Sequence, residues 1–163
     1  MSETQHFADI LAPFVPTPHE VVDRMLKLAG VSVDDLVYDL GCGDGRILIA
    51  AAQKYGARGL GVDTEPYRVA ESATNAKNAG VDHLLEFRLQ DAQTVDLKPA
   101  TVIMLYLVHW STARLQSIIR NSARPGTRIV SHNYPMADWV PTRIDNFNDA
   151  TGRASGTLFL WTT

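Results

Sequence analysis

Residues 38–46 read YDLGCGDGR and directly follow the apolar pair Leu36-Val37. Glycines at alternate positions after an apolar run predict a strand that turns into a helix through a loop whose backbone approaches a ligand closely. A phosphate-binding loop of the Gly-x4-Gly-Lys-Ser/Thr type is excluded, because Arg46 and Ile47 follow Gly45. The dinucleotide fingerprint G-x-G-x-x-G also fits poorly, because Arg46 occupies the position of its third glycine.

The composition predicts one globular domain. The chain has 163 residues, 45% hydrophobic and 20% charged, which is enough to bury a full core. A formal net charge of -3 weighs against a surface built mainly for nucleic-acid phosphates, and the single cysteine, Cys42, excludes an internal disulfide. We see no secretory signal and no apolar run long enough to span a bilayer. We therefore expect a cytoplasmic protein that binds no metal, does not insert into membranes, and is a monomer or a weak homo-oligomer.

Strand-like and helix-like patterns alternate along the chain. This order predicts a Rossmann-like α/β fold with a seven-stranded, mostly parallel sheet, helices on both faces and an antiparallel final strand. Residues 1–16 read as an extended N-terminal arm, and residues 17–163 as a single domain. The expected strands are 36–40, 59–63, 84–89, 101–106, 127–131, 142–147 and 157–161. Four helices are expected. The first has Thr17 as N-cap and Pro18 as its first residue, and the second follows the glycine loop. The third begins at Pro66 with Val69, Ala70, Ala73 and Ala76 on one face, and the fourth has Ser111 as N-cap.

The acids of the glycine loop indicate which ligand it holds. Asp39 lies at the end of the expected strand and Asp44 lies inside the loop. Two carboxylates beside a pyrophosphate repel it by several kcal/mol, on the order of the estimate for charges near a protein surface. S-adenosylmethionine carries an ammonium and a sulfonium instead of a phosphate. Asp39 can bind the ammonium directly or through water, while Gly41 and Gly43 allow the backbone to approach the methionine part.

Two further acids follow the next strands. Asp63 ends the second strand, where a carboxylate can accept both hydroxyls of a ribose. Asp91 follows the third strand and can accept from an adenine amino group, with the Ala92 amide donating to the ring. A nicotinamide cofactor also has ribose hydroxyls, so Asp63 alone does not discriminate. Asp63 as a helix cap and Asp91 as an ordinary turn residue remain alternatives, and Cys42 is expected to be a packed residue.

At this point the chain resembles the seven-strand (class I) S-adenosylmethionine-dependent methyltransferases, through YDLGCGDGR. With FVPTP, GARGLGVD, ATVIMLYL, PGTRIVSH and DWVP, it is similar to small protein-lysine methyltransferases over about residues 13–161. That group includes archaeal broad-specificity enzymes and animal mitochondrial enzymes that modify the ATP synthase c-subunit and the adenine nucleotide translocase. The resemblance implies a protein partner that presents lysine, and an arm over the cofactor around residues 14–17. The resemblance implies cofactor contacts at Asp39, Gly41, Asp63 and Asp91. The full set of residues that we expect to contact the cofactor is Val15, Thr17, Asp39, Gly41, Cys42, Gly43, Asp63, Thr64, Asp91, Ala92 and Tyr106.

The methyl acceptor site is expected after the fourth and fifth strands. Tyr106 is a catalytic candidate by position, with a core aromatic as the alternative. His109 and His132 follow the two strands and can accept a proton, although a histidine bonded to backbone is the commoner case. Residues 106–110, YLVHW, depart from the polar stretch expected in the family, so the acceptor pocket is expected to differ.

The main prediction is a methyltransferase that acts on lysine side chains of proteins and releases S-adenosylhomocysteine. Because methyl transfer is a displacement at the cofactor, the protein mainly aligns the acceptor, and no strong base is required. Methylation of a small molecule or of RNA remains an alternative. A module that binds the cofactor without transferring methyl is another, and a nicotinamide oxidoreductase fits least.

Overall fold

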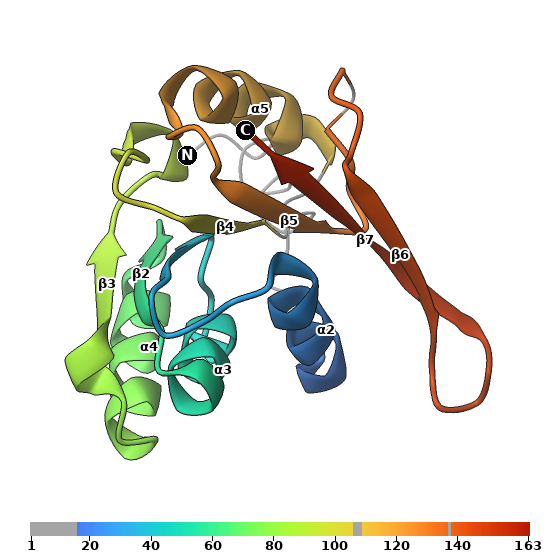
Figure 1. Cartoon of the computed structure of the whole chain (residues 1–163). Helices are drawn as coiled ribbons and strands as arrows, with labels where there is room; N and C mark the ends of the chain where they lie inside the picture. The colour runs from blue at the N-terminus through green and yellow to red at the C-terminus, as the bar shows by residue number, and fades with distance from the viewer. Residues whose placement is uncertain (1–15, 106–108, 137) are drawn as a thin grey trace, which may run out of the picture.

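The structure is a computed structural model that describes residues 16–105, 109–136 and 138–163, with backbone alone at 109–113. Its centre is a seven-stranded sheet in the order β3-β2-β1-β4-β5-β7-β6 (Figure 1). The strands are β1 (Leu36–Leu40), β2 (Arg58–Asp63), β3 (Leu85–Leu89), β4 (Val102–Leu105), β5 (Arg128–His132), β6 (Arg143–Asn148) and β7 (Ala154–Thr162).

The pairing confirms the predicted fold class. Strands β1 to β5 pair in parallel, β7 runs antiparallel to β5, and β6 pairs antiparallel with β7. The chain builds β2 and β3 on one side of β1 and then crosses to β4 on the other. Ligands of such sheets bind beyond the carboxyl ends of the strands at this reversal. The glycine loop follows β1 and therefore lies at the reversal.

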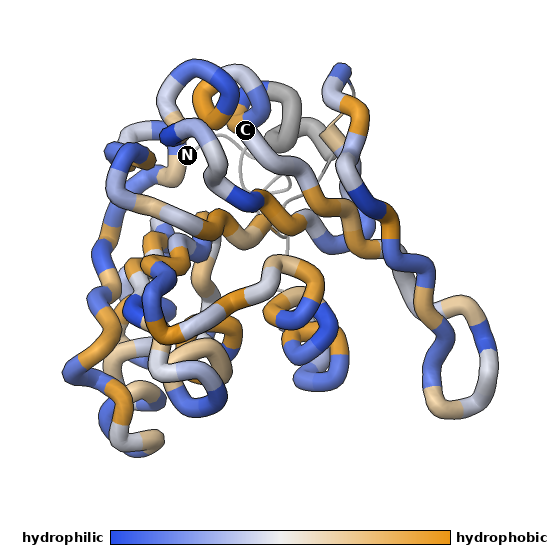
Figure 2. The backbone as a smooth tube through the Cα atoms, viewed as in Figure 1, coloured by the Kyte–Doolittle hydropathy of each residue, from blue (hydrophilic) through white to orange (hydrophobic). Residues whose placement is uncertain are grey.

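Helices cover both faces of the sheet. Helices α2 (His19–Ala29), α3 (Arg46–Tyr55) and α4 (Pro66–Asn78) lie on one face, and α5 (His109–Ser122) lies on the other (Figure 1). Two short 3-10 helices are η1 (Asp82–Leu84) and η2 (Ala92–Thr94). Hydrophobic residues concentrate in the strands between these layers (Figure 2), and the two larger core clusters lie on opposite faces of the sheet. Within the described ranges, no helix is long and apolar enough to cross a bilayer.

Several predicted boundaries were wrong. Helix α2 begins at His19, because Pro18 has a non-helical ψ of 145° and is itself the N-cap, so Thr17 precedes the cap. Helix α5 begins at His109, so Ser111 lies inside the helix rather than at its N-cap. Leu84 belongs to η1 and not to β3.

The face that α4 buries also differs from the prediction. Ala70 and Ala73 are exposed, whereas Ser72 and Ala76 are buried. A polar side chain lies on the packed face because α4 contacts the backbone of the glycine loop, whose carbonyl groups need donors. Counting apolar residues alone therefore placed Ala76 correctly, but it assigned two exposed alanines to the packed face and missed Ser72.

Strand β7 begins three residues earlier than predicted, and Gly156 lies in it rather than in the turn. Only the part from Leu158 onward pairs with β5, so the β6–β7 hairpin extends past the carboxyl end of β5 (Figure 1). A Cβ at Gly156 would come within 2.9 Å of Phe147 and of the Asn133 side chain. Asn133 joins the hairpin through its amide to the carbonyl of Thr157, at 2.8 Å.

Candidate cofactor site

Three acids lie at the carboxyl ends of neighbouring strands. Asp39 pairs in register with Gly61 near the end of β1, and Asp63 is the last residue of β2. Asp91 follows β3 by two residues, and the amide of Gln90 donates to the Asp63 carbonyl at 3.0 Å. The structure therefore brings these three predicted residues to one edge of the sheet.

The carboxylate of Asp39 is the most unusual group in the site. Asp39 is 3% exposed, and none of the described residues donates a hydrogen bond to its carboxylate. Burial raises the pKa of Asp39 well above its usual value, and the charges of Asp63 and Asp44 raise it further. A buried carboxylate among other acids favours a cation and disfavours an anion at the same place.

The carboxylate of Asp63 is held by two backbone amides. Its Oδ2 accepts from the amide of Gly43 at 3.1 Å, and its Oδ1 accepts from the amide of Glu65 at 3.0 Å. Each carboxylate oxygen can accept a second hydrogen bond, and Asp63 is only half-buried. This arrangement fixes the orientation of the carboxylate and leaves it able to accept from a pair of hydroxyl groups.

The glycine loop turns back over the end of β2. The amides of Gly41 and Cys42 both donate to the Val62 carbonyl at 2.9 Å, and Gly45 has a φ of +83°, which disfavours other residues. The Cys42 thiol points into the protein, 3.9 Å from the Ser72 hydroxyl. Burial raises the pKa of Cys42 to about 12. Cys42 is thus a packed residue, as expected. Because its side chain points inward, its predicted contact with the cofactor would have to come from its backbone atoms, and it stays a prediction.

Two residues of α4 hold the loop and were missed by the sequence analysis. The fully buried Ser72 hydroxyl donates to the Gly43 carbonyl at 2.7 Å, and the Asn75 side chain donates to the Asp44 carbonyl at 3.0 Å. A signal for them was present in the sequence. Polar residues recur at helical spacing of four and three among the alanines, at Arg68, Ser72 and Asn75, and they indicate a polar face of the helix that could contact the loop.

Asp44 does not act as a free charge. Its carboxylate pairs with Arg46, with Nη2 to Oδ2 at 2.6 Å. Although burial raises the pKa of Asp44, the hydrogen bonds from Arg46 lower it below its usual value. Arg46 also donates from Nη1 to the carbonyl of Thr17 at 3.0 Å, and Thr17 is buried. The predicted exclusion of phosphate therefore rests on Asp39 and Asp63 more than on Asp44.

The predicted adenine-side residues lie at the rim. Asp91 is exposed, and its Oδ1 accepts from the amide of Gln93 at 2.9 Å as the cap of η2. Ala92 is half-buried, and Thr64 is exposed beside Asp63. Asp91 therefore acts as a turn residue that caps η2, which was one of the alternatives considered. The second oxygen of its carboxylate can still accept a hydrogen bond from a ligand.

Part of the predicted site is not described. Val15, Tyr106 and the side chain of His109 lie outside the described residues. His132 ends β5 and is 5% exposed, with its ring centroid 6.3 Å from that of Phe147. Burial lowers the pKa of His132, so its imidazole is neutral at neutral pH.

Asp39, the expected cofactor residue, and His132, an expected acceptor-site residue, lie on the same face of the sheet. Asp39 and His132 follow Val37 and Val130 by two residues, and both valines belong to the core cluster under α2. Because side chains alternate along a strand, Asp39 and His132 lie on that same face. They are separated by β4 alone, which places β5 about 10 Å from β1.

These residues fit S-adenosylmethionine. The buried carboxylate of Asp39 has no donor among the described residues, as a site for an ammonium requires, and Asp63 suits a ribose. No phosphate-binding cluster of amides is present at the described part of the loop, since the amides of Gly41, Cys42 and Gly43 donate within the protein. The acceptor carboxylates of Asp39 and Asp63 thus match a cofactor that carries an ammonium at one end and a ribose in its middle.

Comparison with known proteins agrees with this chemistry. Residues 39–143 match the family described as the ANTKMT methyltransferase domain. The chain is 37% identical over 150 residues to a protein-lysine N-methyltransferase of Saccharolobus islandicus, covering 91% of this chain and 92% of that protein. It is 30% identical to the ATP synthase c-subunit lysine N-methyltransferase of Xenopus laevis, covering 81% of this chain and 58% of that longer protein.

Solved structures share the fold. An RNA methyltransferase from Salinibacter ruber in complex with S-adenosylhomocysteine is 44% identical and superposes with a TM-score of 0.86, covering 91% of this chain and 93% of that one. A geranyl diphosphate methyltransferase in complex with S-adenosylmethionine superposes with a TM-score of 0.72 at 13% identity. At this identity the similarity concerns the fold alone.

Proposed function

The chain belongs to the family of the ANTKMT methyltransferase domain, and from this premise we propose that it methylates lysine side chains of proteins. It is a methyltransferase with a class I fold, its cofactor is S-adenosylmethionine, and its product is S-adenosylhomocysteine. One observation carries the choice of lysine. The Saccharolobus islandicus relative is named for that activity, and the two chains match over nearly their whole lengths.

The site residues have separate proposed roles at the two ends of the cofactor. When bound, the cofactor would supply a methyl group on its sulfonium, and transfer to the acceptor would release the sulfur as S-adenosylhomocysteine. Asp39 accepts from the ammonium, and Asp63 accepts from the two ribose hydroxyls. Asp91 and the amide of Ala92 contact the adenine. The hydrogen bonds from Gly43 and Glu65 support this assignment for Asp63, because they fix its carboxylate before the ribose arrives.

The acceptor lysine must reach the methyl group as a neutral amine. Partial desolvation of the amine lowers its pKa and favours this form. His132 is a candidate to take up the released proton, since its neutral imidazole lies on the face of the sheet that carries Asp39. Tyr106 and His109 stay candidates on their place in the sequence, after β4.

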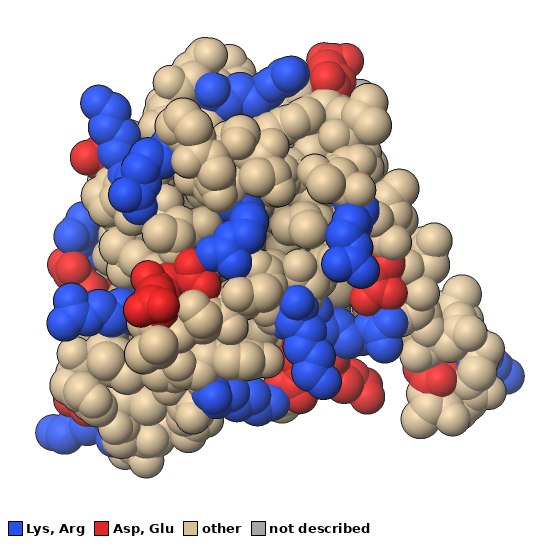
Figure 3. All heavy atoms as spheres, in the orientation of Figure 1, with Lys and Arg blue, Asp and Glu red and all other residues tan. Residues whose placement is uncertain are grey.

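RNA is the second candidate acceptor, because the Salinibacter ruber protein is named an RNA methyltransferase. The charge of this chain is less favourable to RNA. Acidic residues outnumber Lys and Arg by 18 to 15, and on the face shown in Figure 3 both signs are scattered without a continuous basic surface. Since phosphate contacts dominate nucleic-acid affinity, this balance favours a protein acceptor.

A labelling experiment tests the proposal. The protein is incubated with methyl-labelled S-adenosylmethionine and a cell extract, and the products are divided between protease and nuclease. We expect label that protease releases and nuclease leaves intact, with methyl-lysine in the digested protein by mass spectrometry. Asp39→Asn, which is expected to bind the cofactor weakly, measures the background from enzymes of the extract.

The other outcomes decide among the alternatives. Label that survives protease and disappears with nuclease assigns RNA as the acceptor. Label that passes a small-pore filter assigns a small molecule. No label above the Asp39→Asn background, from protein that binds S-adenosylhomocysteine, indicates a module that binds the cofactor without transferring methyl.

Four further properties belong to the proposal. The partner is a protein that presents lysine, as for the named relatives. We also propose a cytoplasmic protein that is a monomer or a weak homo-oligomer, in which residues 1–16 form an arm over the cofactor. Deletion of residues 1–16 is expected to weaken S-adenosylhomocysteine binding, and an unchanged affinity by calorimetry would count against this role of the arm.

A further inference from the structure

Arg46 contacts two parts of the chain that are far apart in sequence. It is the first residue of α3, and its Nε lies 3.1 and 3.2 Å from the two carboxylate oxygens of Asp44. Its Nη2 lies 2.6 Å from Oδ2 of Asp44, and its Nη1 donates to the Thr17 carbonyl at 3.0 Å. One guanidinium thus joins the glycine loop to the stretch of chain just before α2.

The shape of the guanidinium accounts for an arginine at this place. A planar group with five N–H donors can bind a carboxylate with two nitrogens and still reach a carbonyl with the third. A lysine has one nitrogen, which cannot span both partners in this geometry. The Arg46 side chain is 23% exposed and that of Asp44 is 16% exposed, so water screens these contacts only partly.

The partners of Arg46 are themselves fixed. Asp44 is also held through its backbone, because the Asn75 side chain donates to its carbonyl at 3.0 Å. Thr17 is 4% exposed, and its carbonyl is a buried group that needs a donor. One residue on, the carbonyl of Pro18 accepts from the amide of Val21 and starts the hydrogen bonds of α2. The position of Arg46 therefore sets where α2 begins relative to the loop.

We propose that Arg46 is a positioning residue for cofactor binding, which holds the start of α2 against the glycine loop through the carbonyl of Thr17. Its pairing with Asp44 has a second consequence. It offsets the charge of Asp44, so that Asp39 and Asp63 are the acids that act on the cofactor. An arginine in place of the third glycine is thus a working part of the site.

The experiment compares Arg46→Lys, Asp44→Asn and the double variant with a matched control, Arg58→Gln. Arg58 is an exposed arginine at the first position of β2, at the opposite end of that strand from the site. Isothermal calorimetry measures the dissociation constant of S-adenosylhomocysteine for each full-length protein, and thermal denaturation shows that each is folded. Calorimetry reports on folded molecules, so a role in stability alone would lower the melting temperature and leave the dissociation constant unchanged.

We expect Arg46→Lys to raise the dissociation constant about tenfold, the size of one lost hydrogen bond to a charged group. Asp44→Asn keeps the contact to Thr17 and is expected to have a smaller effect. The double variant should bind like Arg46→Lys, because the contact to Thr17 is already lost. Wild-type affinity in Arg46→Lys, or an equal loss in Arg58→Gln, would overturn the proposal. If Arg46→Lys does not fold, Asp44→Asn decides: an affinity equal to that of the wild type contradicts it, and a loss of about threefold supports it.

Discussion

Replacing Asp39 with asparagine is predicted to have opposite effects on stability and on cofactor affinity. The substitution keeps the shape of the side chain and removes its charge. A hydrogen bond to a charged group contributes about 1.5–3 kcal/mol, so S-adenosylhomocysteine, which keeps the ammonium, should bind between about tenfold and about a hundredfold more weakly. Among the described residues, Asp39 is the buried carboxylate at the carboxyl end of β1, so the lost charge has no substitute of the same kind there.

Stability without ligand is expected to change in the other direction. Burial, with the charges of Asp63 and Asp44, raises the pKa of Asp39 above the value of 3.8 for an unperturbed aspartate. The folded protein therefore binds the proton of Asp39 more tightly than the unfolded chain. The cost of the buried charge is absent below the unfolded pKa, grows as pH rises through the folded pKa, and is complete above it. Asp39→Asn removes that cost, so its melting temperature should exceed that of the wild type at neutral pH and converge with it at acidic pH.

Two measurements check both effects. Calorimetry gives the dissociation constant of S-adenosylhomocysteine, and thermal denaturation without ligand between about pH 4 and pH 8, the range in which a raised carboxyl pKa acts, gives the difference in stability. Asp34→Asn is the control, since Asp34 is exposed before β1, at the far end of that strand. An unchanged affinity in Asp39→Asn would refute the assigned contact with the ammonium. A melting temperature lower than that of the wild type at neutral pH would refute the buried, uncompensated charge.

Three smaller effects follow from the packing around the loop. Gly61→Ala places a Cβ 2.8 Å from both Cys42 and Phe87, and should reduce the free energy of unfolding by about 1–3 kcal/mol in urea titration. An unchanged free energy of unfolding would show that the surrounding residues move aside, and would contradict the prediction. Ser72→Ala leaves the buried Gly43 carbonyl without its 2.7 Å donor, so it should lower the free energy of unfolding by about 1–3 kcal/mol and weaken S-adenosylhomocysteine binding. A loss of stability with unchanged affinity would show that this hydrogen bond does not contribute to cofactor binding. Burial raises the pKa of Cys42 to about 12 and so disfavours its reactive thiolate, and iodoacetamide should label the folded protein far more slowly than the unfolded protein.

Strand and helix order could be predicted from the sequence because it depends on local patterns. The periodicity around residues 36–40 and the glycines after it placed β1 and the loop correctly. The acids at the strand ends could also be placed, since parallel strands bring their carboxyl ends to one edge. Errors arose where a tertiary contact overrides local preference. Helix α2 does not start at Pro18, and Ser72 lies on the packed face of α4, which the pattern had assigned to apolar residues only.

The contacts of Arg46 could not be predicted from spacing alone. In the sequence, Arg46 appeared only as a departure from a dinucleotide fingerprint, and Asp44 appeared as an extra negative charge. Their pairing lies within one turn of chain, but its effect depends on Thr17, which is 29 residues earlier. The extension of β7 was missed for a similar reason, because residues 154–157 pair with β6 alone and carry little apolar pattern.

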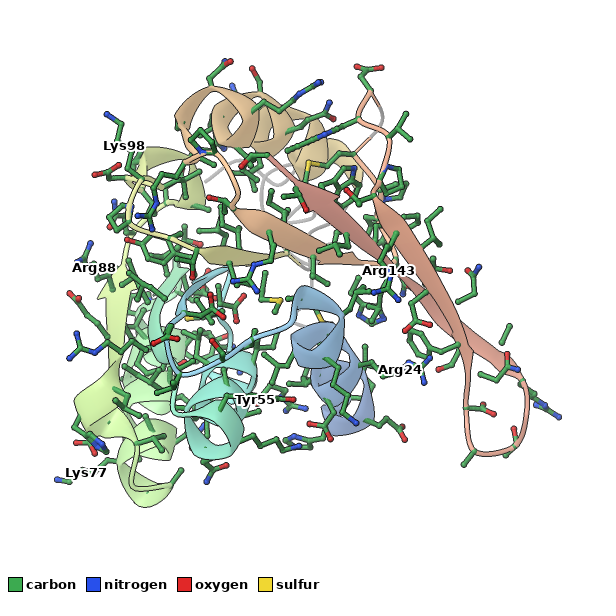
Figure 4. All side chains as sticks on the ribbon, in the orientation of Figure 1. Arg24, Tyr55, Lys77, Arg88, Lys98 and Arg143 are labelled. Carbon is green, nitrogen blue, oxygen red and sulfur yellow. The ribbon has the colours of Figure 1, made fainter. Side chains whose placement is uncertain are left out.

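The β6–β7 hairpin contacts α2 through its strand β6, on the side of the sheet that carries His132. Arg24 of α2 pairs with Asp145 of β6 at 2.9 Å, and its guanidinium lies 5.0 Å from the ring centroid of Phe147 (Figure 4). Because the Arg24 side chain is 45% exposed, this ion pair adds little stability. It does orient the hairpin against the helix whose start lies at the cofactor loop.

The acids at the carboxyl edge also affect the choice of acceptor. Asp39, Asp63 and Asp91 lie at or just beyond the carboxyl ends of three neighbouring strands, and Asp63 and Asp91 reach solvent. In the proposed complex, the ammonium of S-adenosylmethionine would lie beside Asp39, and the two rim carboxylates would then set the local field. Such a field attracts an approaching lysine ammonium and repels a polyphosphate chain. The arrangement that excludes a phosphate from the cofactor loop therefore also favours a lysine of a protein over RNA at the methyl group.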